Sequence, residues 1–474
     1  MRISTSTIYS SNVSNMNNLE AQIAQTQQQI STGNRIQSPA DDPVAAARII
    51  ELNQANSVNT QYGTNNTAAQ NTLSLSENVL QSVTTLLQSV KSTAVNAANG
   101  VLTTSDRQSL ATSLQGQLQE LMGLANSTDG TGNYLFSGSK GNTQPFVNTA
   151  AGVVYQGDSL QRNMQVSPTR QIASTDVGTD IFMKVRNGNG TFTAAPGLTM
   201  SIGANIAVGA TTVTVPNTGG LVAGMPITGG GFPAGTTVAS ITDATHFVAS
   251  SPATTATAAG QSIQFANAGT GTGIITPGAV INPALYNNNT YQLSFSVTGG
   301  VTTYSVTDVT NPAAPVPVAG QTNVAYTSGN AINFNGIQVQ MSGAPANGDV
   351  FSVSPSANQS IFGTLSSLIN TLNSPAAPGG TSFNQSVNDA LGNIDQSLNN
   401  VLTVRASMGS RLNELTALQN TVSQQGLQYQ QTLTSIQGTD YNKAISDLTQ
   451  QHTALQAAQQ SFAAISKLSL FNYL

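Results

Sequence analysis

Residues 387–437 read VNDALGNIDQSLNNVLTVRASMGSRLNELTALQNTVSQQGLQYQQTLTSIQ, and a seven-residue apolar repeat runs through them. The repeat consists of two series: Leu391, Leu398, Leu412 and Leu433, and beside them Ile394, Val401, Met408, Leu415, Val422, Tyr429 and Ile436. Residues at this spacing lie on one face of a helix, so the stretch predicts one long helix with an apolar stripe. Gly438-Thr439-Asp440 interrupts the repeat and predicts the end of that helix.

The N-terminal part of the chain carries a matching pattern. A helix is expected over 43–98, because Asp42 suits the N-cap, Pro43 suits the first helical position and Asn99-Gly100 ends the run. Its later half repeats every seven residues, at Leu73, Leu80, Leu87 and Ala94, beside Val83, Val90 and Ala97. Thr104 or Ser105 is expected to cap a third helix.

A shorter helix is expected beyond a break at each end, over 7–32 and from Tyr441 onward, with Gly33 as the stop of the first. Two long stripes of similar length most readily bury each other, so the sequence predicts an antiparallel helical rod built from both ends. Two unrelated helical domains are the alternative.

The middle of the chain is predicted to be β structure. Sixteen of the 18 prolines fall between Pro145 and Pro378, which argues against long helices there. Alternating runs predict strands at Ile181–Val185, Thr211–Val215, Tyr291–Val297 and Ile337–Met341. Residues of about 190–285, richest in Gly, Ala and Thr, indicate an extra insert, and we expect that joining residue 187 to residue 289 would remove it without harming the rod.

The predicted fold class is therefore α+β multidomain, with a helical rod from both termini and β-rich outer domains. Three parts are expected: a terminal coiled-coil assembly domain (1–40 plus 440–474), a helical rod domain with a β-hairpin (41–186 plus 356–439) and the outer β region (187–355).

Composition excludes several classes of function. Only 7% of residues are charged and the net charge is −5, so a basic surface for nucleic acid is absent. Residues 187–404 contain no Lys or Arg. There is no cysteine, and no window is apolar enough for a membrane span, so neither thiol chemistry nor a membrane partner is expected.

No catalytic, metal or cofactor site is expected either. His246 and His452 are far apart in the sequence, and the Gly-rich stretches lack the Lys-Ser/Thr ending of a phosphate loop. Asp41-Asp42 could be paired catalytic carboxylates, but a helix cap explains them more simply. The sequence therefore favours a protein that is not an enzyme.

The terminal helices carry the main functional signal, because an apolar stripe on a short helix requires a partner. Few charges would need to be desolvated if many identical subunits packed together there. The candidate assembly-interface residues are Met16, Leu19, Ile23, Ile30, Tyr441, Ile445, Leu448, Leu455, Phe462, Leu470 and Phe471.

Short motifs add a family resemblance. STGNRI at 31–36 and SPADDP at 38–43 resemble the N-terminal signature of the bacterial flagellin superfamily. Other motifs resemble its hook–filament junction family, the type 3 hook-associated proteins: NYLFSG at 133–138, YQGD at 155–158, Arg162, Asp176 to Phe182, GDVF at 348–351, QSIF at 359–362, TDY at 439–441 and LSLFNYL at 468–474. The resemblance covers roughly 1–186 and 330–474 and does not clearly cover 190–285.

This resemblance implies a structural protein of the bacterial flagellum, with helical termini in the core of a tubular assembly. It implies a ring of identical subunits between a neighbouring hook-associated protein and the flagellin filament. It also implies an extracellular location, reached through the flagellar type III apparatus with the help of an export chaperone. The alternatives are flagellin itself, whose C-terminus should differ from LSLFNYL, and a surface adhesin with a helical stalk.

Overall fold

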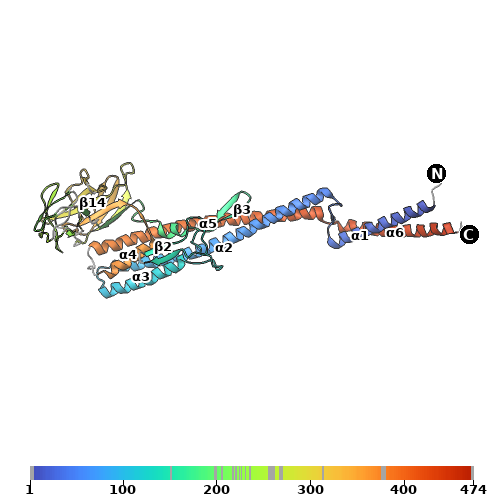
Figure 1. Ribbon diagram of the computed structural model, residues 1–474, viewed down its shortest axis with the longest axis horizontal. Helices are drawn as coiled ribbons and strands as arrows, with labels where there is room; N and C mark the ends of the chain where they lie inside the picture. The colour runs from blue at the N-terminus through green and yellow to red at the C-terminus, as the bar shows by residue number, and fades with distance from the viewer. Residues whose placement is uncertain are drawn as a thin grey trace. The chain divides into compact units, whose positions relative to one another are not determined.

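The computed structural model describes residues 5–470, apart from 150–151, 197–199, 204–205, 255–261, 266–270, 312–313, 375–380 and several short gaps between 216 and 235. Helices come from both ends of the chain and strands from its middle, which confirms the predicted α+β class (Figure 1). The helices are α1 Thr5–Thr32, α2 Pro43–Ala97, α3 Thr104–Ala125, α4 Ile361–Asn373, α5 Thr381–Gln437 and α6 Tyr441–Leu470.

N-caps and a terminal glycine define where several of the helices begin or end. Asp42 caps α2, since its Oδ1 accepts from the Ala45 N–H at 3.0 Å. Gly33 ends α1 with a φ of 72°, which glycine adopts without strain. The predicted cap of α3 was wrong by one residue: Thr103 is the N-cap, because it forms a reciprocal capping box with Asp106.

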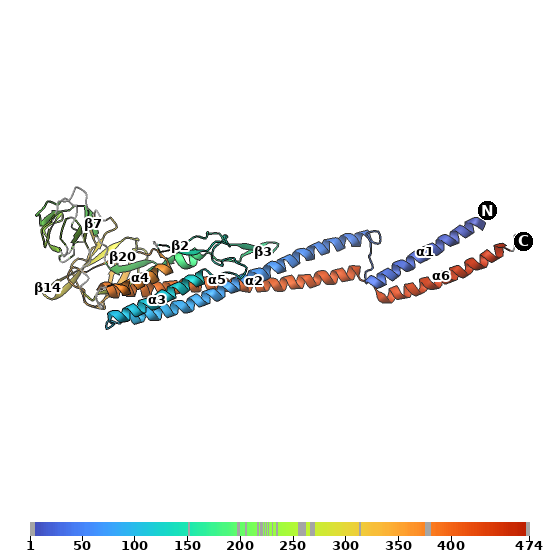
Figure 2. The same cartoon turned by 60° about the horizontal axis from the view of Figure 1, so that its bottom comes forward.

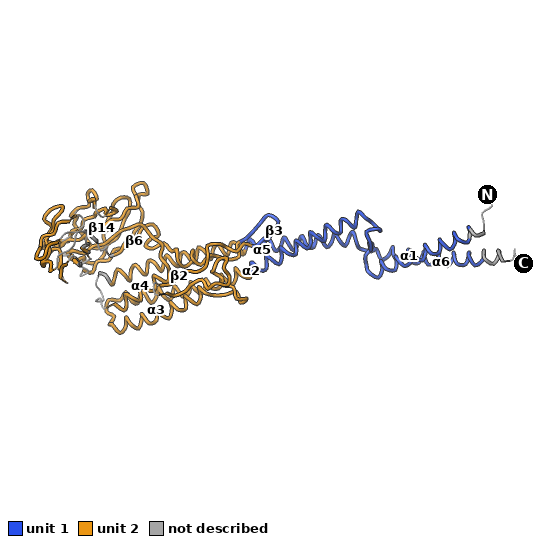
Figure 3. Tube along the Cα trace, viewed as in Figure 1, with its two compact units in different colours: residues 1–70, 164–172, 413–474 blue, residues 71–163, 173–412 orange. Residues whose placement is uncertain are grey.

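The chain forms two compact units, and each contains part of α2 and part of α5 (Figure 3). Unit 1 comprises residues 1–70, 164–172 and 413–474; unit 2 comprises 71–163 and 173–412. These limits differ from the three parts expected from sequence, and that three-part division stays a proposal.

Helices α2 and α5 pair in an antiparallel manner. In unit 2, Glu77 pairs with Arg405 at 2.7 Å and Lys91 pairs with Asp395 at 2.5 Å, so one helix advances as the other returns. In unit 1, Asn59 Nδ2 donates to the Val422 carbonyl at 2.8 Å. The buried side chains include the predicted stripes: Leu73, Leu80, Val83, Leu87, Val90, Ile394, Val401, Met408 and Leu415.

Two small hairpins and one further helix complete the helical part. The hairpins are β1 Phe146–Thr149 with β2 Gly152–Tyr155, and β3 Asn163–Ser167 with β4 Arg170–Ala173. Helix α4 packs along α3 (Figures 1 and 2). Phe146, Phe182 and Phe362 form a ring cluster with centroids 5.2–5.9 Å apart, which joins the first hairpin to α4. The strand predicted at Ile181–Val185 was wrong, because residues 179–183 form a single π-helical turn, η1 Thr179–Met183.

A β-sandwich follows, and its two sheets enclose one apolar core. The larger sheet has the order β16-β15-β14-β20-β6, with β17 also on β15, and the smaller has the order β13-β19-β18. Their bounds are β6 Phe192–Pro196, β13 Ile274–Val280, β14 Tyr291–Thr298, β15 Val301–Asp308, β16 Val316–Pro317, β17 Val324–Ala325, β18 Ala331–Phe334, β19 Ile337–Ser342 and β20 Val350–Pro355. A short strand pair, β5 Val185–Arg186 with β21 Asn358–Gln359, lies at its entry and exit along the chain.

A second, smaller sandwich is made of two three-stranded sheets, β7-β12-β9 and β10-β11-β8. Its strands are β7 Met200–Gly203, β8 Thr212–Thr214, β9 Ile227–Gly229, β10 Val238–Ile241, β11 His246–Ala249 and β12 Ser262–Phe265. The predicted limits of the insert, 190–285, were too wide. They include β6, which pairs with β20, and β13, which pairs with β19, so both strands belong to the first sandwich.

No helix among the residues that the structure describes is long and apolar enough to cross a membrane.

Candidate assembly interface

The terminal helices α1 and α6 pack against each other in unit 1 (Figure 1). The rings of Tyr9 and Phe462 lie 4.9 Å apart, whereas the other end of the pair joins Gln29 to Thr439, so the helices run antiparallel. Ile23 is only 7% exposed and Ala444 only 6%. The two apolar stripes therefore face each other within one chain.

The pairing covers the predicted interface residues unequally. Met16, Leu19, Ile30, Leu448, Leu455 and Phe462 are half-buried, and Ile23 is buried. Tyr441 is 50% exposed and Ile445 is 54% exposed, so the pairing with α1 leaves much of both side chains uncovered. The side chain of Leu470 and the whole of Phe471 lie outside the described residues. The structure thus brings together most of the stripe and leaves part of its apolar surface uncovered.

Few charges interrupt this surface. Glu20 is the one charged residue of α1, while Lys443, Asp447 and Lys467 are those of α6. A surface with so few ionic groups loses little solvation energy when it is buried against another molecule. The α1–α6 pair is therefore suited to dense packing.

A joint made of backbone hydrogen bonds connects the break that follows α1 with the break that precedes α6. The Thr439 N–H donates to the Gly33 carbonyl at 3.0 Å, and the Arg35 N–H donates to the Gln437 carbonyl at 2.6 Å. A Cβ on Gly33 would lie 3.0 Å from the Tyr441 hydroxyl, so a side chain there would make a tight contact with Tyr441. The STGNRI and TDY motifs thus meet at one place.

The loop that follows is fixed by Asp41 rather than by apolar contacts. Its carboxylate accepts from the Ser38 N–H at 2.8 Å and the Gln37 N–H at 2.9 Å, and these bonds hold the pKa of Asp41 below its usual value. Asp42 caps α2 and lies 3.7 Å from Arg35. Both carboxylates of the SPADDP motif therefore have structural partners.

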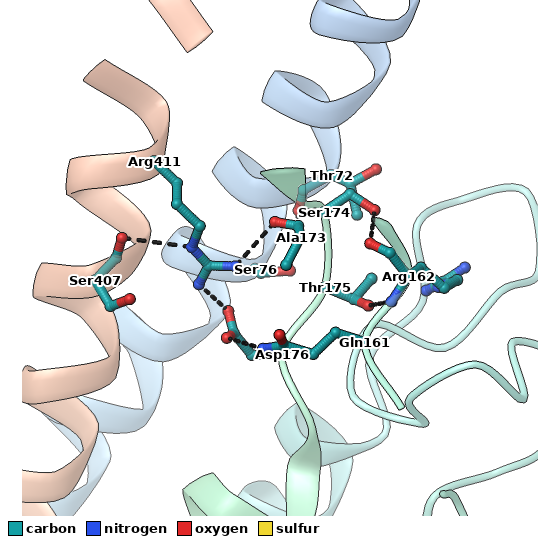
Figure 4. A network of polar contacts seen from close by, with 10 residues as sticks. All are labelled: Thr72, Ser76, Gln161, Arg162, Ala173, Ser174, Thr175, Asp176, Ser407 and Arg411. Atoms are coloured by element: carbon teal, nitrogen blue, oxygen red, sulfur yellow. Dashed lines mark hydrogen bonds and ion pairs between the residues drawn. The ribbon is translucent and has the colours of Figure 1, made fainter. Parts of the chain in front are cut away.

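Arg411 of α5 belongs to a polar network that includes two of the motif residues, Arg162 and Asp176 (Figure 4). Its guanidinium pairs with Asp176 at 2.5 Å and donates to the Ala173 carbonyl at 2.9 Å. Arg162 is tied to the same segment, because its N–H donates to Thr175 Oγ1 at 3.1 Å and its carbonyl accepts from Ser174 Oγ at 3.0 Å. This network fixes the chain after β4 onto α5.

Sequence reasoning missed Tyr9 and Ala444 in the helix pair. Tyr9 lies seven residues before Met16 and is in phase with the predicted stripe, so extending the repeat would have found it. It also missed exposed apolar side chains on the neighbouring helices, including Val44, Ile50 and Leu427. These lie outside the heptad series, and nothing in the periodicity marks them.

The residues that the structure describes give little support for a metal site or a histidine-based site. No three His, Asp or Glu side chains gather there in a way that could hold a metal ion. His246 lies on the second sandwich, where its Nδ1 is 2.9 Å from the Asp243 carboxylate, and both side chains are exposed. His452 is an exposed residue of α6.

The two ends match known protein families. The model of the bacterial flagellin N-terminal helical region matches residues 3–141, and that of the bacterial flagellin C-terminal helical region matches residues 391–474. Both ends of the chain are thus similar to the helical regions of bacterial flagellins. The joint of STGNRI with TDY is therefore a joint between the two flagellin-type regions.

The curated proteins that the chain resembles are hook-associated proteins. Flagellar hook-associated protein 3 of Salmonella typhimurium is 42% identical over 185 residues, which are 39% of this chain and 58% of that protein. The Escherichia coli protein of the same name is 40% identical over 182 residues, 38% of this chain and 57% of the relative. The matched part thus spans less than two thirds of the length of either relative.

Solved structures extend the likeness through most of the fold. The flagellar junction protein FlgL from Legionella pneumophila is 27% identical, with a TM-score of 0.60, and the match covers 83% of this chain and 100% of that one. Xanthomonas campestris FlgL is 25% identical, with a TM-score of 0.59, covering 81% of this chain and 99% of that one. About a fifth of this chain therefore has no counterpart in either structure.

Proposed function

We propose that this chain is a structural subunit of the bacterial flagellum that forms a junction ring between a neighbouring hook-associated protein and the flagellin filament. The observation that carries the proposal is the α1–α6 pair, which leaves Tyr441 and Ile445 exposed on a surface with few charges. Apolar surface of this kind favours contact with further copies of the same chain. The likeness to flagellar hook-associated protein 3 over 185 residues supports the junction rather than the filament.

We further propose that the remaining interface residues, from Met16 to Phe471, lie in the shared core of the ring. In this role the chain acts by packing and performs no catalysis. It would reach the outside of the cell unfolded through the flagellar type III apparatus, with a chaperone holding its C-terminal region beforehand. The absence of cysteine is compatible with this route, because no disulfide has to form after export.

The test separates the three candidate roles. A labelled copy is expressed in a bacterium whose own junction-protein gene has been deleted, and filaments, swimming and the position of the label are scored. We expect restored filaments with the label at one point between hook and filament. Label along the whole filament, in a parallel strain that keeps its own junction protein, would identify a flagellin, and unrestored filaments with restored surface attachment in the deletion strain would identify an adhesin.

Ile445→Asp sharpens this test, because Ile445 is 54% exposed and its replacement leaves the α1–α6 contact intact. A charge at that position would be buried only in the assembly, at a cost of several kcal/mol per subunit. We expect no filaments, with flagellin released unpolymerised and the melting curve unchanged. Gln450→Asp, on another exposed part of α6, is the matched control and should assemble normally. Normal filaments on Ile445→Asp would remove this surface from the interface.

A further inference from the structure

Helix α5 is attached to the first sandwich by side-chain amides. Gln385 is fully buried, and its Oε1 accepts from the Ile275 N–H at 2.7 Å while its Nε2 donates to the Ile275 carbonyl at 2.8 Å. The side chain thus pairs with β13 as a neighbouring strand would. The second hydrogen of the same amide goes to Asp389 Oδ1 at 2.7 Å.

The same face of α5 continues this pattern. Asn393 accepts from the Gly188 N–H at 3.1 Å, and Asn400 donates to the Ile181 carbonyl at 2.9 Å. The positions 385, 389, 393 and 400 recur at helical spacing; Gln385 bonds to the first sandwich, Asn393 to the loop before β6, and Asn400 to η1. Asp389 is the one carboxylate among these four positions.

Two cavities of about 370 and 270 Å³ flank Asp389, and its side chain lines both. Each is large enough to hold several water molecules. Thr193 and Asn393 also line both cavities, and α4 contributes Thr364, Ser367 and Thr371 to the smaller one. The contact between helix and sandwich is thus polar and leaves room beside the carboxyl group.

No Lys or Arg among the described residues that line the two cavities balances this carboxylate. Among the residues that line the two cavities, Asp389 and Asp395 are the only ionisable ones, and Asp395 is paired with Lys91 of α2 at 2.5 Å. The side chains contributed by β6, β13 and α4 are uncharged. Arg186, next to the 187–189 loop, is bonded to the Ser356 carbonyl at 3.0 Å, and residues 187–404 contain no Lys or Arg.

We propose that Asp389 is a proton-operated latch between α5 and the first β-sandwich. The neutral carboxyl group fits the closed contact, whereas the ionised group favours a loosened contact in which the carboxylate is more fully hydrated. This device concerns how the β-sandwich is attached and does not depend on the proposed place in the flagellum.

The direction of the effect follows from proton linkage. Burial raises the pKa of Asp389 to about 7, and the hydrogen bond from Gln385 only partly opposes this. A loosened contact hydrates the carboxyl group and returns its pKa toward 3.8. The closed contact therefore binds the extra proton between about pH 4 and pH 7, so closure weakens as pH rises through that range and levels off above it.

Hydrogen exchange of the full chain tests the latch. The reporter is the peptide around Ile275, whose N–H is bonded to Gln385, followed from pH 5 to pH 8 and corrected for intrinsic exchange. We expect its opening constant to rise by about tenfold for each pH unit below 7 and then to level off. Asp389→Asn keeps an acceptor for Gln385 without a titrating group, so its corrected exchange should not change with pH.

Asp395→Asn is the matched control, because it removes a carboxylate six residues away on the same helix. Its exchange should keep the pH dependence of the unsubstituted chain. A flat profile in the unsubstituted chain, or the same slope in Asp389→Asn, would overturn the proposal. If Asp389→Asn does not fold, the carboxyl-carbon NMR titration of Asp389 in the unsubstituted chain decides: a midpoint near 7 supports the latch, and a midpoint near 4 rejects it.

Discussion

Arg411 of α5 and Asp176 lie 235 positions apart in the chain and pair at 2.5 Å, with only 15% and 13% of their side chains exposed. Asp176 also accepts a hydrogen bond from the Gln161 side-chain amide at 3.2 Å. The pair therefore closes a long loop of chain onto the helix, and its strength depends on both charges being present.

Removing one partner of the Arg411–Asp176 pair should destabilise the fold. Arg411→Met leaves Asp176 nearly buried without a countercharge, so we expect the free energy of unfolding to fall by about 3 kcal/mol. Urea denaturation followed by circular dichroism measures this. Arg170→Met is the matched control, because Arg170 pairs with Glu414 at an exposed site and its loss should change little. Equal effects of the two substitutions would contradict the special role of Arg411.

Gly33 and Gly116 should respond to alanine in opposite ways. Gly33 has a φ of 72° and meets the Tyr441 hydroxyl, so Gly33→Ala should destabilise the joint of α1 and α6 by about 1–2 kcal/mol. Gly116 lies in α3 with open space around it, so Gly116→Ala should stabilise the chain by about 0.5–1 kcal/mol. Thermal melting gives the signs, and two shifts in the same direction would refute this account.

The second sandwich should be removable if the deletion stays inside its own strands. Pro196 pairs with Phe351, and a Cβ on Gly273 would lie 3.3 Å from the Phe351 ring, so the two ends are close enough for a short Gly-Ser linker in place of 198–270. Val350 loses its cover in this deletion and should be changed to Thr. We expect a folded chain that still supports filaments in the complementation test.

The wider deletion that joins residue 187 to residue 289 is the informative contrast. It removes β6 and β13, and with them Phe192, Ala194 and Ile275 of the first sandwich core. We expect this variant to lose the sandwich and to be cleaved rapidly by chymotrypsin in the remaining strands. A stable product from the wider deletion would mean that β6 and β13 are not needed for the first sandwich.

Asp158 should make the hairpin region sensitive to acid. The hydroxyl and the N–H of Ser139 both donate to its carboxylate and hold the pKa of Asp158 below its usual value. A depressed pKa stabilises the fold above the unfolded value near 3.8, and this contribution is lost as pH falls through the folded value. Asp158→Asn should therefore melt below the unsubstituted chain at pH 7, and the gap should narrow toward pH 2.5. A difference in melting temperature that does not change with pH would show that the charge of Asp158 does not contribute to stability.

Periodicity and caps were enough to predict the paired helices of both ends, but not α4 or the exact cap of α3. The heptad stripes have one geometric solution, which is why Leu73, Leu87, Val401 and Met408 are buried as expected. The limits of the insert were beyond this reasoning, because β6 and β13 resemble neighbouring loop-rich sequence and are assigned only by pairing with β20 and β19. Strand pairing between distant segments leaves no local mark on either segment.

The candidate interface was predicted only in part for a similar reason. A stripe identifies which side chains share a face, as for Ile23 and Leu455, but not whether the face is covered by the same chain. Ile445 follows the same sequence pattern as Leu448 and is nevertheless exposed. That difference depends on how α1 crosses α6, and the spacing of apolar residues along the sequence does not specify that crossing.

The lack of basic residues in the two sandwiches also determines how this protein can be labelled and mapped. All five lysines, Lys91, Lys140, Lys184, Lys443 and Lys467, lie in the helices or the chain before the first sandwich, so amine-reactive dyes and cross-linkers will mark those parts alone. Trypsin has no site between Arg186 and Arg405, so both sandwiches, α4 and the start of α5 remain together on one large tryptic peptide. Mapping the sandwiches therefore requires a protease that cleaves after aromatic or acidic residues, and an introduced cysteine offers a unique labelling position because the chain has none of its own.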